Sequence, residues 1–247
     1  MSEFEGQVVI VTGSAGAGVG QATARRLAAE GAEVVVSDLN EKRTLAVGES
    51  LAEEHGRDFL AIACDVSNQE SVAELVGKTI ERYGRIDHLV NNAYRDMETP
   101  FLEMDDVTWH TPINVCLHGT YYCTKAAVPH MIEQGGGNIV NFASVVTWRG
   151  GQGRAQYAAA KAGIIAFTRV IALELGEHNI RANTVAPSSV WNEWMGRTMG
   201  TVPEGSDEHP LDRSAMPDEL ANVVRFLCSK ESEYITGEVI SVGGQRP

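Results

Sequence analysis

Short runs of apolar residues, rich in valine and isoleucine, alternate along the chain with stretches whose apolar residues recur every three or four positions. Such runs are typical of buried strands, and the wider spacing is typical of helices that pack by one face. The pattern predicts strands at about 7–12, 33–37, 59–64, 86–91, 138–144, 180–186 and 239–242, and helices at about 19–30, 41–54, 69–83, 105–133, 156–175 and 217–228. Gly31 is placed to end the first helix, and Ser67 to cap the third. Apolar strands that alternate with helices indicate an α/β fold, a doubly wound parallel sheet of about seven strands with helices on both faces.

The chain has 247 residues, 43% of them hydrophobic, and shows no internal repeat or linker-like segment. Since α/β folds of this length are often undivided, we expect one domain over residues 1–247. Its least regular part, Ser188 to Met216, is expected to form a substrate-binding loop or lid, because loops on a rigid sheet carry specificity in such folds.

The charge and cysteine content exclude several classes of function. The excess of 33 acidic over 20 basic residues, a net charge of −13, argues against a nucleic-acid partner. No segment is apolar enough to span a membrane, and the acidic N-terminus does not resemble a secretory signal. The four cysteines and seven histidines show no metal or disulfide spacing, so we expect buried cysteines, no metal and a cytoplasmic location.

A glycine-rich segment, Thr12 to Gly20, joins the first predicted strand to the first predicted helix. Glycines let the backbone approach a pyrophosphate, and the helix N-terminus supplies N–H donors and the positive end of its dipole. The segment therefore predicts a dinucleotide site.

The residue that closes the second predicted strand, Asp38, bears on which dinucleotide binds. A carboxylate there can accept hydrogen bonds from the adenosine ribose and would repel the extra 2′-phosphate of NADP. The glycine turn contains no lysine or arginine, so NAD is favoured, with Arg43 the nearest opposing charge. The alternative is that Asp38 only caps the next helix. Asp65, after the third strand, is placed to contact adenine or to form a turn.

Tyr157 and Lys161 are four residues apart in a predicted helix and so share one of its faces. An ammonium beside a phenol favours the phenolate and lowers the phenol pKa toward neutrality. Ser144, at the end of the fifth predicted strand, can donate a hydrogen bond to the same substrate oxygen. A plain surface pair on an amphipathic helix is the alternative, and the glycine segment at the other end of the chain weighs against it.

These residues make essentially the whole chain resemble the short-chain dehydrogenase/reductase (SDR) family, NAD(P)-dependent oxidoreductases with a single-domain Rossmann fold. The resemblance rests on an ordered set of motifs: Gly13, Gly18 and Gly20; Asp38; Asp65-Val66; Asn91-Asn92-Ala93; Asn114; Ser144, Tyr157 and Lys161; Asn183 and Pro187; Tyr234-Ile-Thr-Gly237 and Val242-Gly-Gly244. It implies reversible hydride transfer between the nicotinamide of NAD and an alcohol or carbonyl carbon.

The resemblance also implies a catalytic tetrad of Asn114, Ser144, Tyr157 and Lys161. Tyr157 would exchange a proton with the alcohol oxygen, Ser144 would orient that oxygen, and Lys161 would lower the Tyr157 pKa and hold the nicotinamide ribose. Asn114 would hold a water that links Lys161 to solvent, in a helix that Pro112 distorts by removing a regular hydrogen bond. The implied NAD-binding residues are Gly13, Ser14, Gly18, Val19, Gly20, Asp38, Leu39, Asp65, Val66, Asn92, Ala93, Tyr157, Lys161, Pro187 and Val190.

Three departures from the family pattern point to an altered pocket. Four residues, Ser14 to Ala17, stand where the family has three, which predicts a bulged turn and leaves open which N–H groups meet the pyrophosphate. Tyr94 replaces a glycine and must point away from the cofactor. Ser188 replaces a glycine after Pro187, with Asn192 where a threonine often contacts the cofactor. None of these changes removes a catalytic group, so we expect an active enzyme.

The substrate is expected to be a hydrophobic, medium-sized secondary alcohol or ketone. The predicted pocket residues are Tyr94, Ser144, Trp148, Tyr157, Trp191 and Trp194, with Met195 and Met199 also in the irregular segment. The spacing of that segment's apolar residues equally suits plain packing. Arg149 or Arg154 could bind a substrate carboxylate or phosphate, or could be solvated loop residues.

Two other functions remain open, a 3-oxoacyl-carrier reductase and a dinucleotide sensor without turnover. A 3-oxoacyl-carrier reductase usually uses NADP, which Asp38 opposes. A sensor would not need all four tetrad residues, so the presence of all four argues against it. The resemblance implies a homotetramer, or sometimes a dimer, built from the helices after Asp105 and Gln156 and from the last strand. The alanine-rich face of the second of these helices suits packing between subunits and packing within one chain equally well.

Overall fold

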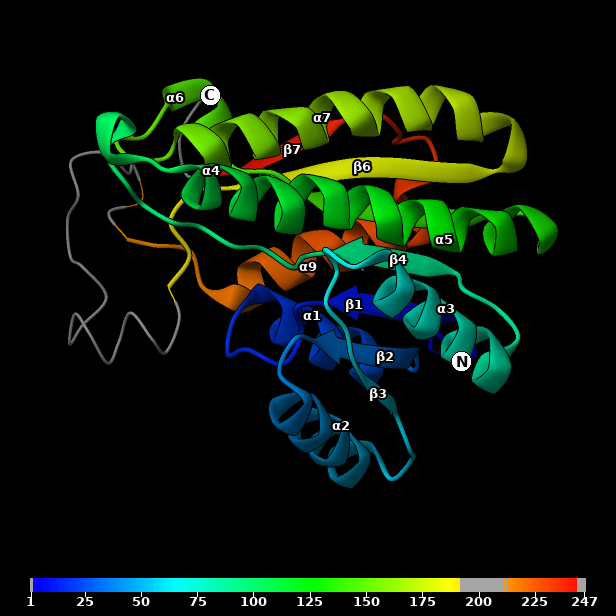
Figure 1. Cartoon of the computed structure of the whole chain (residues 1–247). Coiled ribbons are helices and arrows are strands. Elements are labelled where there is room, and N and C mark those ends of the chain that lie inside the picture. The colour runs from blue at the N-terminus through cyan, green and yellow to red at the C-terminus, as the bar shows by residue number, and fades with distance from the viewer. Residues whose placement is uncertain (1, 192–210, 212, 244–247) are drawn as a thin grey trace.

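A seven-stranded parallel sheet forms the centre of the computed structural model, which describes residues 2–191, 211 and 213–243 (Figure 1). The strand order is β3-β2-β1-β4-β5-β6-β7, and every pairing is parallel. The strands are β1 (Val8–Thr12), β2 (Glu33–Asp38), β3 (Leu60–Ala63), β4 (His88–Asn91), β5 (Gly137–Phe142), β6 (Ile180–Pro187) and β7 (Val239–Val242). The predicted fold class, a Rossmann-like α/β fold, is confirmed.

The helices connect these strands and cover both faces of the sheet. They are α1 (Val19–Ala29), α2 (Glu41–His55), α3 (Gln69–Tyr83), α4 (Asp106–Pro112), α5 (Gly119–Glu133), α6 (Val146–Arg149), α7 (Ala155–Leu175) and α9 (Pro217–Cys228). A π-helix, Ile113–His118, joins α4 to α5, and short 3₁₀ helices lie at Phe101–Glu103, Gly176–His178 and Lys230–Ser232. Within the described ranges, no helix has both the length and the apolar character that a membrane crossing needs.

Alternate side chains of each strand enter different layers of the core. Val9 and Val11 of β1 pack in the layer that contains α1, α2 and α9, whereas Val8 and Ile10 pack in the layer that contains α3, α5 and α7. Because both layers are buried, the strands read as continuous apolar runs, and the strand prediction succeeds for this reason. The direction of winding reverses between β1 and β4, and ligands of such folds bind at the carboxyl ends of these strands.

Two local predictions about helix structure have different outcomes. The distortion expected at Pro112 is confirmed, since the π-helix begins at the next residue. The cap expected from Ser67 is wrong, because Asn68 immediately precedes α3 and accepts from the backbone of Glu70 and Ser71. The Ser67 hydroxyl instead donates to Asp65 Oδ1 at 2.6 Å. Asparagine and serine are equally good N-cap residues. The sequence therefore could not tell which of Ser67 and Asn68 caps α3 without knowing where the helix begins.

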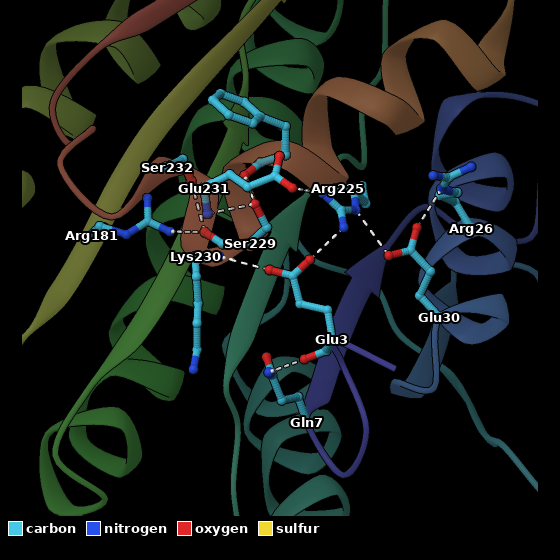
Figure 2. Close-up of polar contacts among 11 residues, drawn as sticks. Glu3, Gln7, Arg26, Glu30, Arg181, Arg225, Ser229, Lys230, Glu231 and Ser232 are labelled. Carbon is cyan, nitrogen blue, oxygen red and sulfur yellow. Dashed lines mark hydrogen bonds and ion pairs between the residues drawn. The ribbon is translucent and has the colours of Figure 1, made fainter. Parts of the chain in front are cut away.

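The N-terminal segment is anchored to the last helix by Arg225 (Figure 2). The Arg225 guanidinium pairs with Glu3, with Glu30 at 3.0 Å and with Glu231 at 3.2 Å, and its side chain is only 19% exposed. The same group lies 5.7 Å from the ring centre of Phe4, which is fully buried. One cation therefore joins the N-terminal segment, the end of α1 and the segment after α9.

We expect Arg225→Ala to lower the free energy of unfolding by about 2 kcal/mol, because the partly buried carboxylates of Glu3 and Glu30 lose their shared cation and Phe4 loses the guanidinium that packs on it. Urea denaturation would measure the loss. Lys78→Ala, which removes an exposed ion pair with Glu74, is the control and should change stability little. Equal losses in the two variants would contradict a structural role for the Arg225 network.

Candidate dinucleotide and catalytic site

Two glycines hold the turn after β1 against the segment after β4. Gly13 has a φ of +65°, and a Cβ at this position would lie 2.8 Å from the Cα of Ala93. A Cβ on Gly20 would collide with the Asn92 side-chain amide, which donates to the carbonyl oxygens of Thr12 and Gly13 at 3.0 Å each. Only glycine fits at positions 13 and 20. These two glycines let the turn after β1 pack closely against the segment after β4.

The first turn of α1 is open. Gly18 precedes the helix and provides no side-chain cap, and the first turn contains no acidic residue. A Cβ added to Gly16 or Gly18 would meet nothing within 4 Å. The first N–H groups of a helix lack partners within that helix and lie at the positive end of its dipole. These donors, with open space beside them, fit the pyrophosphate of a dinucleotide.

Ser14, predicted to contact the dinucleotide, is fully buried between β1 and β2. Its hydroxyl donates to the Val11 carbonyl oxygen at 2.8 Å and accepts from the Ser37 N–H at 3.0 Å. Its own N–H donates to the Ser37 carbonyl oxygen at 2.9 Å. Ser14 thus ties the start of the turn to β2, and its contact with a dinucleotide stays a prediction.

Asp38 lies at the end of β2 and touches the glycine turn. Oδ2 accepts from the Ala15 N–H at 3.3 Å, and Oδ1 accepts from the Asn40 N–H at 3.1 Å and pairs with Arg43 at 3.3 Å. The alternative of a helix cap is wrong, because Asn40 precedes α2 and accepts from the Arg43 N–H at 3.0 Å. Asp38 therefore holds Arg43, the opposing charge that the sequence singled out.

Three other predicted cofactor residues line the same edge of the sheet. Asp65 Oδ1 accepts from the Ser67 N–H at 2.9 Å as well as from its hydroxyl, so the turn-forming role is confirmed, and contact with adenine stays a prediction. Leu39 is 71% exposed, and Val66 is buried against Gly119.

Tyr157 and Lys161 lie on the first two turns of α7. Lys161 is 2% exposed, and its Nζ donates to the carbonyl oxygen of Phe142, the last residue of β5, at 2.6 Å. The same nitrogen lies 5.5 Å from the centre of the Tyr157 ring. Ser144 follows Phe142 by two residues. The end of β5 is therefore next to Ser144 in the chain and is also the segment to which Lys161 donates.

The expected lowering of the Tyr157 pKa is not found. Burial raises the pKa of Tyr157, and the negative charge of Asp96 adds to that effect. Burial also lowers the pKa of Lys161. The expected lowering applies to an ammonium beside a phenol in water. Here Tyr157 and Lys161 are both removed from water, and the Lys161 ammonium donates to a carbonyl oxygen. Tyr157 therefore favours its protonated form in this structure.

The other two residues of the expected tetrad belong to the segment after β5 and to the π-helix. The Ser144 hydroxyl accepts from the Val146 N–H at 3.3 Å, which leaves its own O–H as a donor. Asn114 lies in the π-helix and is exposed. The π-helix packs against α7, because Cys116 shares a buried cluster with Ala160 and Tyr157.

The expected substrate-binding residues are only partly described. Tyr94 is 60% exposed and Trp148 is 42% exposed. Val190 forms a bridge with Ala215, and the adjacent Trp191 N–H donates to the Ala215 carbonyl oxygen at 2.8 Å. These residues follow Pro187, the last residue of β6. Trp194, Met195, Met199 and Asn192, with most of the predicted lid, lie outside the described residues.

Sequence reasoning missed the environment of Arg154, three residues before Tyr157. Its side chain is 42% exposed, as expected of a solvated loop residue, but it is not unpaired, because it forms ion pairs with Asp96 at 3.2 Å and with Glu98 at 3.3 Å. Asp96 belongs to no recognisable motif, so the only available signal was its position shortly after Asn91-Asn92. Throughout the described ranges, no group of three or more His, Cys, Asp or Glu side chains could hold a metal ion.

Comparison with known proteins supports this arrangement. A family model described as "Enoyl-(Acyl carrier protein) reductase" matches residues 13–244. The chain is 40% identical to "(5R,7aS)-5-hydroxy-7a-methyl-1-oxo-2,3,5,6,7,7a-hexahydro-1H-indene-carboxyl-CoA reductase" of Mycobacterium tuberculosis, over 99% of this chain and 94% of the relative. It is 38% identical to the 3-oxoacyl-[acyl-carrier-protein] reductase FabG of Thermotoga maritima, over 98% of each chain.

A solved structure shows the same fold over the whole chain. The crystal structure of a short chain dehydrogenase from Mycobacterium smegmatis has a TM-score of 0.88 and 39% identity, covering 100% of this chain and 95% of the other. With the strand order, the glycine turn and the Tyr157–Lys161 pair, these similarities show that the chain belongs to the short-chain dehydrogenase/reductase family, oxidoreductases that act with a nicotinamide dinucleotide on keto or hydroxyl substrates.

Proposed function

We propose that this protein is an NAD-dependent oxidoreductase that transfers hydride between the nicotinamide and a hydrophobic, medium-sized secondary alcohol or ketone. The observation that carries the proposal is the position of Tyr157 and Lys161 at the carboxyl end of β5. The glycine turn and the open first turn of α1 lie at this same edge of the sheet. A proton-transfer group and a dinucleotide cradle at one edge suit hydride transfer to a carbonyl carbon.

Each residue of the tetrad has a role that its surroundings support. The bound dinucleotide supplies or accepts the hydride. Tyr157 gives a proton to the carbonyl oxygen in reduction and removes it from the hydroxyl in oxidation. Ser144 donates to the same oxygen and orients it, since its O–H is left as a donor. Lys161, fixed by the Phe142 carbonyl oxygen, holds the nicotinamide ribose, and Asn114 connects it to solvent.

NAD is proposed over NADP because Asp38 places a carboxylate at the end of β2. Its contact with the Ala15 N–H fixes this charge beside the glycine turn. Arg43, the cation that could attract a 2′-phosphate, is already paired with Asp38. A 2′-phosphate would therefore meet a carboxylate first.

Asp38→Ser is expected to raise the ratio of kcat/KM for NADP to kcat/KM for NAD by at least about tenfold. The substitution removes the repulsion of a 2′-phosphate and frees Arg43 to pair with it. Initial rates with each dinucleotide on one substrate would measure the ratio. Asp58→Ser, an exposed carboxylate ahead of β3, is the control and should leave the ratio unchanged. An unchanged ratio in Asp38→Ser would refute the assignment of NAD.

The substrate class rests on apolar residues near the site and on the relatives. Trp148 on α6 and Tyr94 on the loop after β4 expose aromatic surface at the carboxyl edge of the sheet. The M. tuberculosis relative is named for a bicyclic substrate that carries hydroxyl and oxo groups, which supports a cyclic, hydrophobic skeleton. Because that substrate is a CoA ester and FabG reduces a carrier-bound acyl chain, a 3-oxoacyl thioester is the second candidate substrate.

We further propose a cytoplasmic homo-oligomer, with a tetramer favoured over a dimer, whose ligands are small molecules rather than nucleic acid or membrane. α7 exposes Val170 at 52% and Leu173 at 86%, and apolar side chains on one helix are better covered by a second copy. All four cysteines are free and buried, which suits a reducing compartment. Sedimentation velocity would test the assembly.

Initial rates of nicotinamide reduction with NAD and with NADP test the proposed function. The panel contains cyclic, aromatic, aliphatic and steroidal secondary alcohols, hydroxyacyl thioesters and short polar polyols, and NADH with the matching ketones tests the reverse reaction. Turnover of hydrophobic secondary alcohols with NAD is expected. Turnover of short polar polyols alone would refute the substrate class, and tight NADH binding without turnover would favour the sensor.

A further inference from the structure

Two loops at the carboxyl edge of the sheet are fastened together beside Tyr157. The Thr99 N–H donates to the Gly153 carbonyl oxygen at 2.9 Å, and the Gln156 side-chain amide donates to the Met97 carbonyl oxygen. Arg154 adds its ion pairs with the loop that follows β4. The residue before Tyr157 and the residues after Asn92 are therefore fixed relative to each other.

Asp96 is the acidic group that this arrangement holds nearest to the catalytic pair. Its neighbour Arg95 bonds through its backbone N–H and carbonyl oxygen to the Cys116 thiol, at 3.5 and 3.6 Å. Cys116 in turn packs in one buried cluster with Tyr157. The carboxylate of Asp96 acts electrostatically on both the Tyr157 phenol and the Lys161 ammonium, so it lies in the neighbourhood of that pair.

The hydrogen bonding of this carboxylate is incomplete. Oδ2 pairs with the Arg154 Nε at 3.2 Å, whereas Oδ1 is buried and, within the described part of the chain, lacks a hydrogen-bond partner. An ionised carboxylate offers about four acceptor positions, and a buried oxygen without a donor costs free energy. Functional sites are among the places where proteins depart from full bonding, and a hydroxyl donor of a ligand would complete the bonding of Oδ1.

Building on the proposed function, we propose that Asp96 determines substrate specificity by accepting a hydrogen bond from a second hydroxyl group that the substrate carries beside its reacting carbinol carbon. The favoured substrates are then hydrophobic vicinal diols and the matching hydroxyketones. A substrate carboxylate at that position is disfavoured, because it would face Asp96, while the charge of Arg154 is already shared between Asp96 and Glu98.

Three alcohols that differ at one carbon test this proposal. 1-Phenylethanol has a methyl group beside the carbinol carbon, 1-phenylethane-1,2-diol has a hydroxymethyl group there, and mandelate has a carboxylate. The wild-type enzyme is expected to oxidise the diol with a kcat/KM about tenfold above that for 1-phenylethanol, the gain typical of a hydrogen bond to a charged group. Mandelate is expected to be the poorest of the three.

Asp96→Asn removes the charge and keeps the shape of the side chain. We expect it to lower the ratio of kcat/KM for the diol to that for 1-phenylethanol about tenfold, mainly through the KM of the diol. Glu98→Gln is the matched control, because Glu98 pairs with the same Arg154 but is 65% exposed. It is expected to leave the ratio within about twofold of the wild-type value.

The outcomes separate this proposal from the proposed function. Turnover of the alcohols with no preference for the diol in the wild type would overturn the role of Asp96 alone. A preference that survives in Asp96→Asn, or is lost equally in Glu98→Gln, would do the same. No turnover of any of the three alcohols or their ketones with either dinucleotide would overturn both. Because the wild-type preference is measured first, an Asp96 variant that fails to fold leaves the proposal falsifiable.

Discussion

Tyr157→Phe is expected to lower kcat by about 10²- to 10⁴-fold in both directions, the range typical of a lost general acid or base. The substitution removes one hydroxyl group and keeps the ring that packs with Cys116 and Ala160, so the fold should be preserved. Dinucleotide affinity should change little, because the proposed pyrophosphate site is on the glycine turn and the first turn of α1, away from the Tyr157 hydroxyl. Steady-state rates and NADH fluorescence titration would measure the two quantities separately.

The same variant gives a test by pH. Because burial raises the pKa of Tyr157, the phenolate that alcohol oxidation needs forms only as pH rises, while the phenol that carbonyl reduction needs is present at lower pH. Wild-type oxidation should therefore increase into the alkaline range, and the residual rate of Tyr157→Phe should not follow this increase. Tyr83→Phe is the control, since it removes a buried phenol hydroxyl on α3. A kcat loss below tenfold in Tyr157→Phe would contradict the proposed role of Tyr157 in proton transfer.

Lys161→Met should separate activity from stability. We expect kcat/KM to fall by about 10²-fold or more, because the variant loses the cation proposed to hold the nicotinamide ribose. The free energy of unfolding near neutral pH should stay within about 1 kcal/mol of the wild-type value. The Phe142 carbonyl oxygen loses its donor, but a buried ammonium is replaced by an apolar chain of similar length, and the two effects oppose each other.

The direction in which stability changes with pH also distinguishes Lys161→Met from the wild type. Burial lowers the pKa of Lys161, so the unfolded chain binds the proton more tightly than the folded protein does. Wild-type stability should gain from this residue as pH rises from the folded pKa to the unfolded one, and Lys161→Met should lose that gain. Urea denaturation at neutral and alkaline pH would show the difference. A large loss of stability at neutral pH would contradict this account of Lys161.

The fold could be predicted because the sheet is buried on both faces, which leaves a clear record of apolar runs in strands such as Val8–Thr12. The glycine turn and the Tyr157–Lys161 spacing could be predicted because each depends on neighbours in sequence. The pKa of Tyr157 could not, because it depends on burial by the π-helix and on a carboxylate about sixty residues upstream. Asp96 was missed for the same reason, since its ion pair with Arg154 joins two loops and follows no sequence spacing.

The packing of α1 against α9 joins the two ends of the chain in one layer of the core. Leu27 and Ala24 of α1 are buried there together with Leu220 and Val224 of α9. During synthesis on the ribosome, α1 is made early and can pack against β1, β2 and α2, but the part of its apolar stripe that contacts α9 stays uncovered until Pro217–Cys228 has emerged. This layer of the core can therefore close only after the last helix has been made, and a nascent chain that stops before α9 leaves apolar surface of α1 exposed.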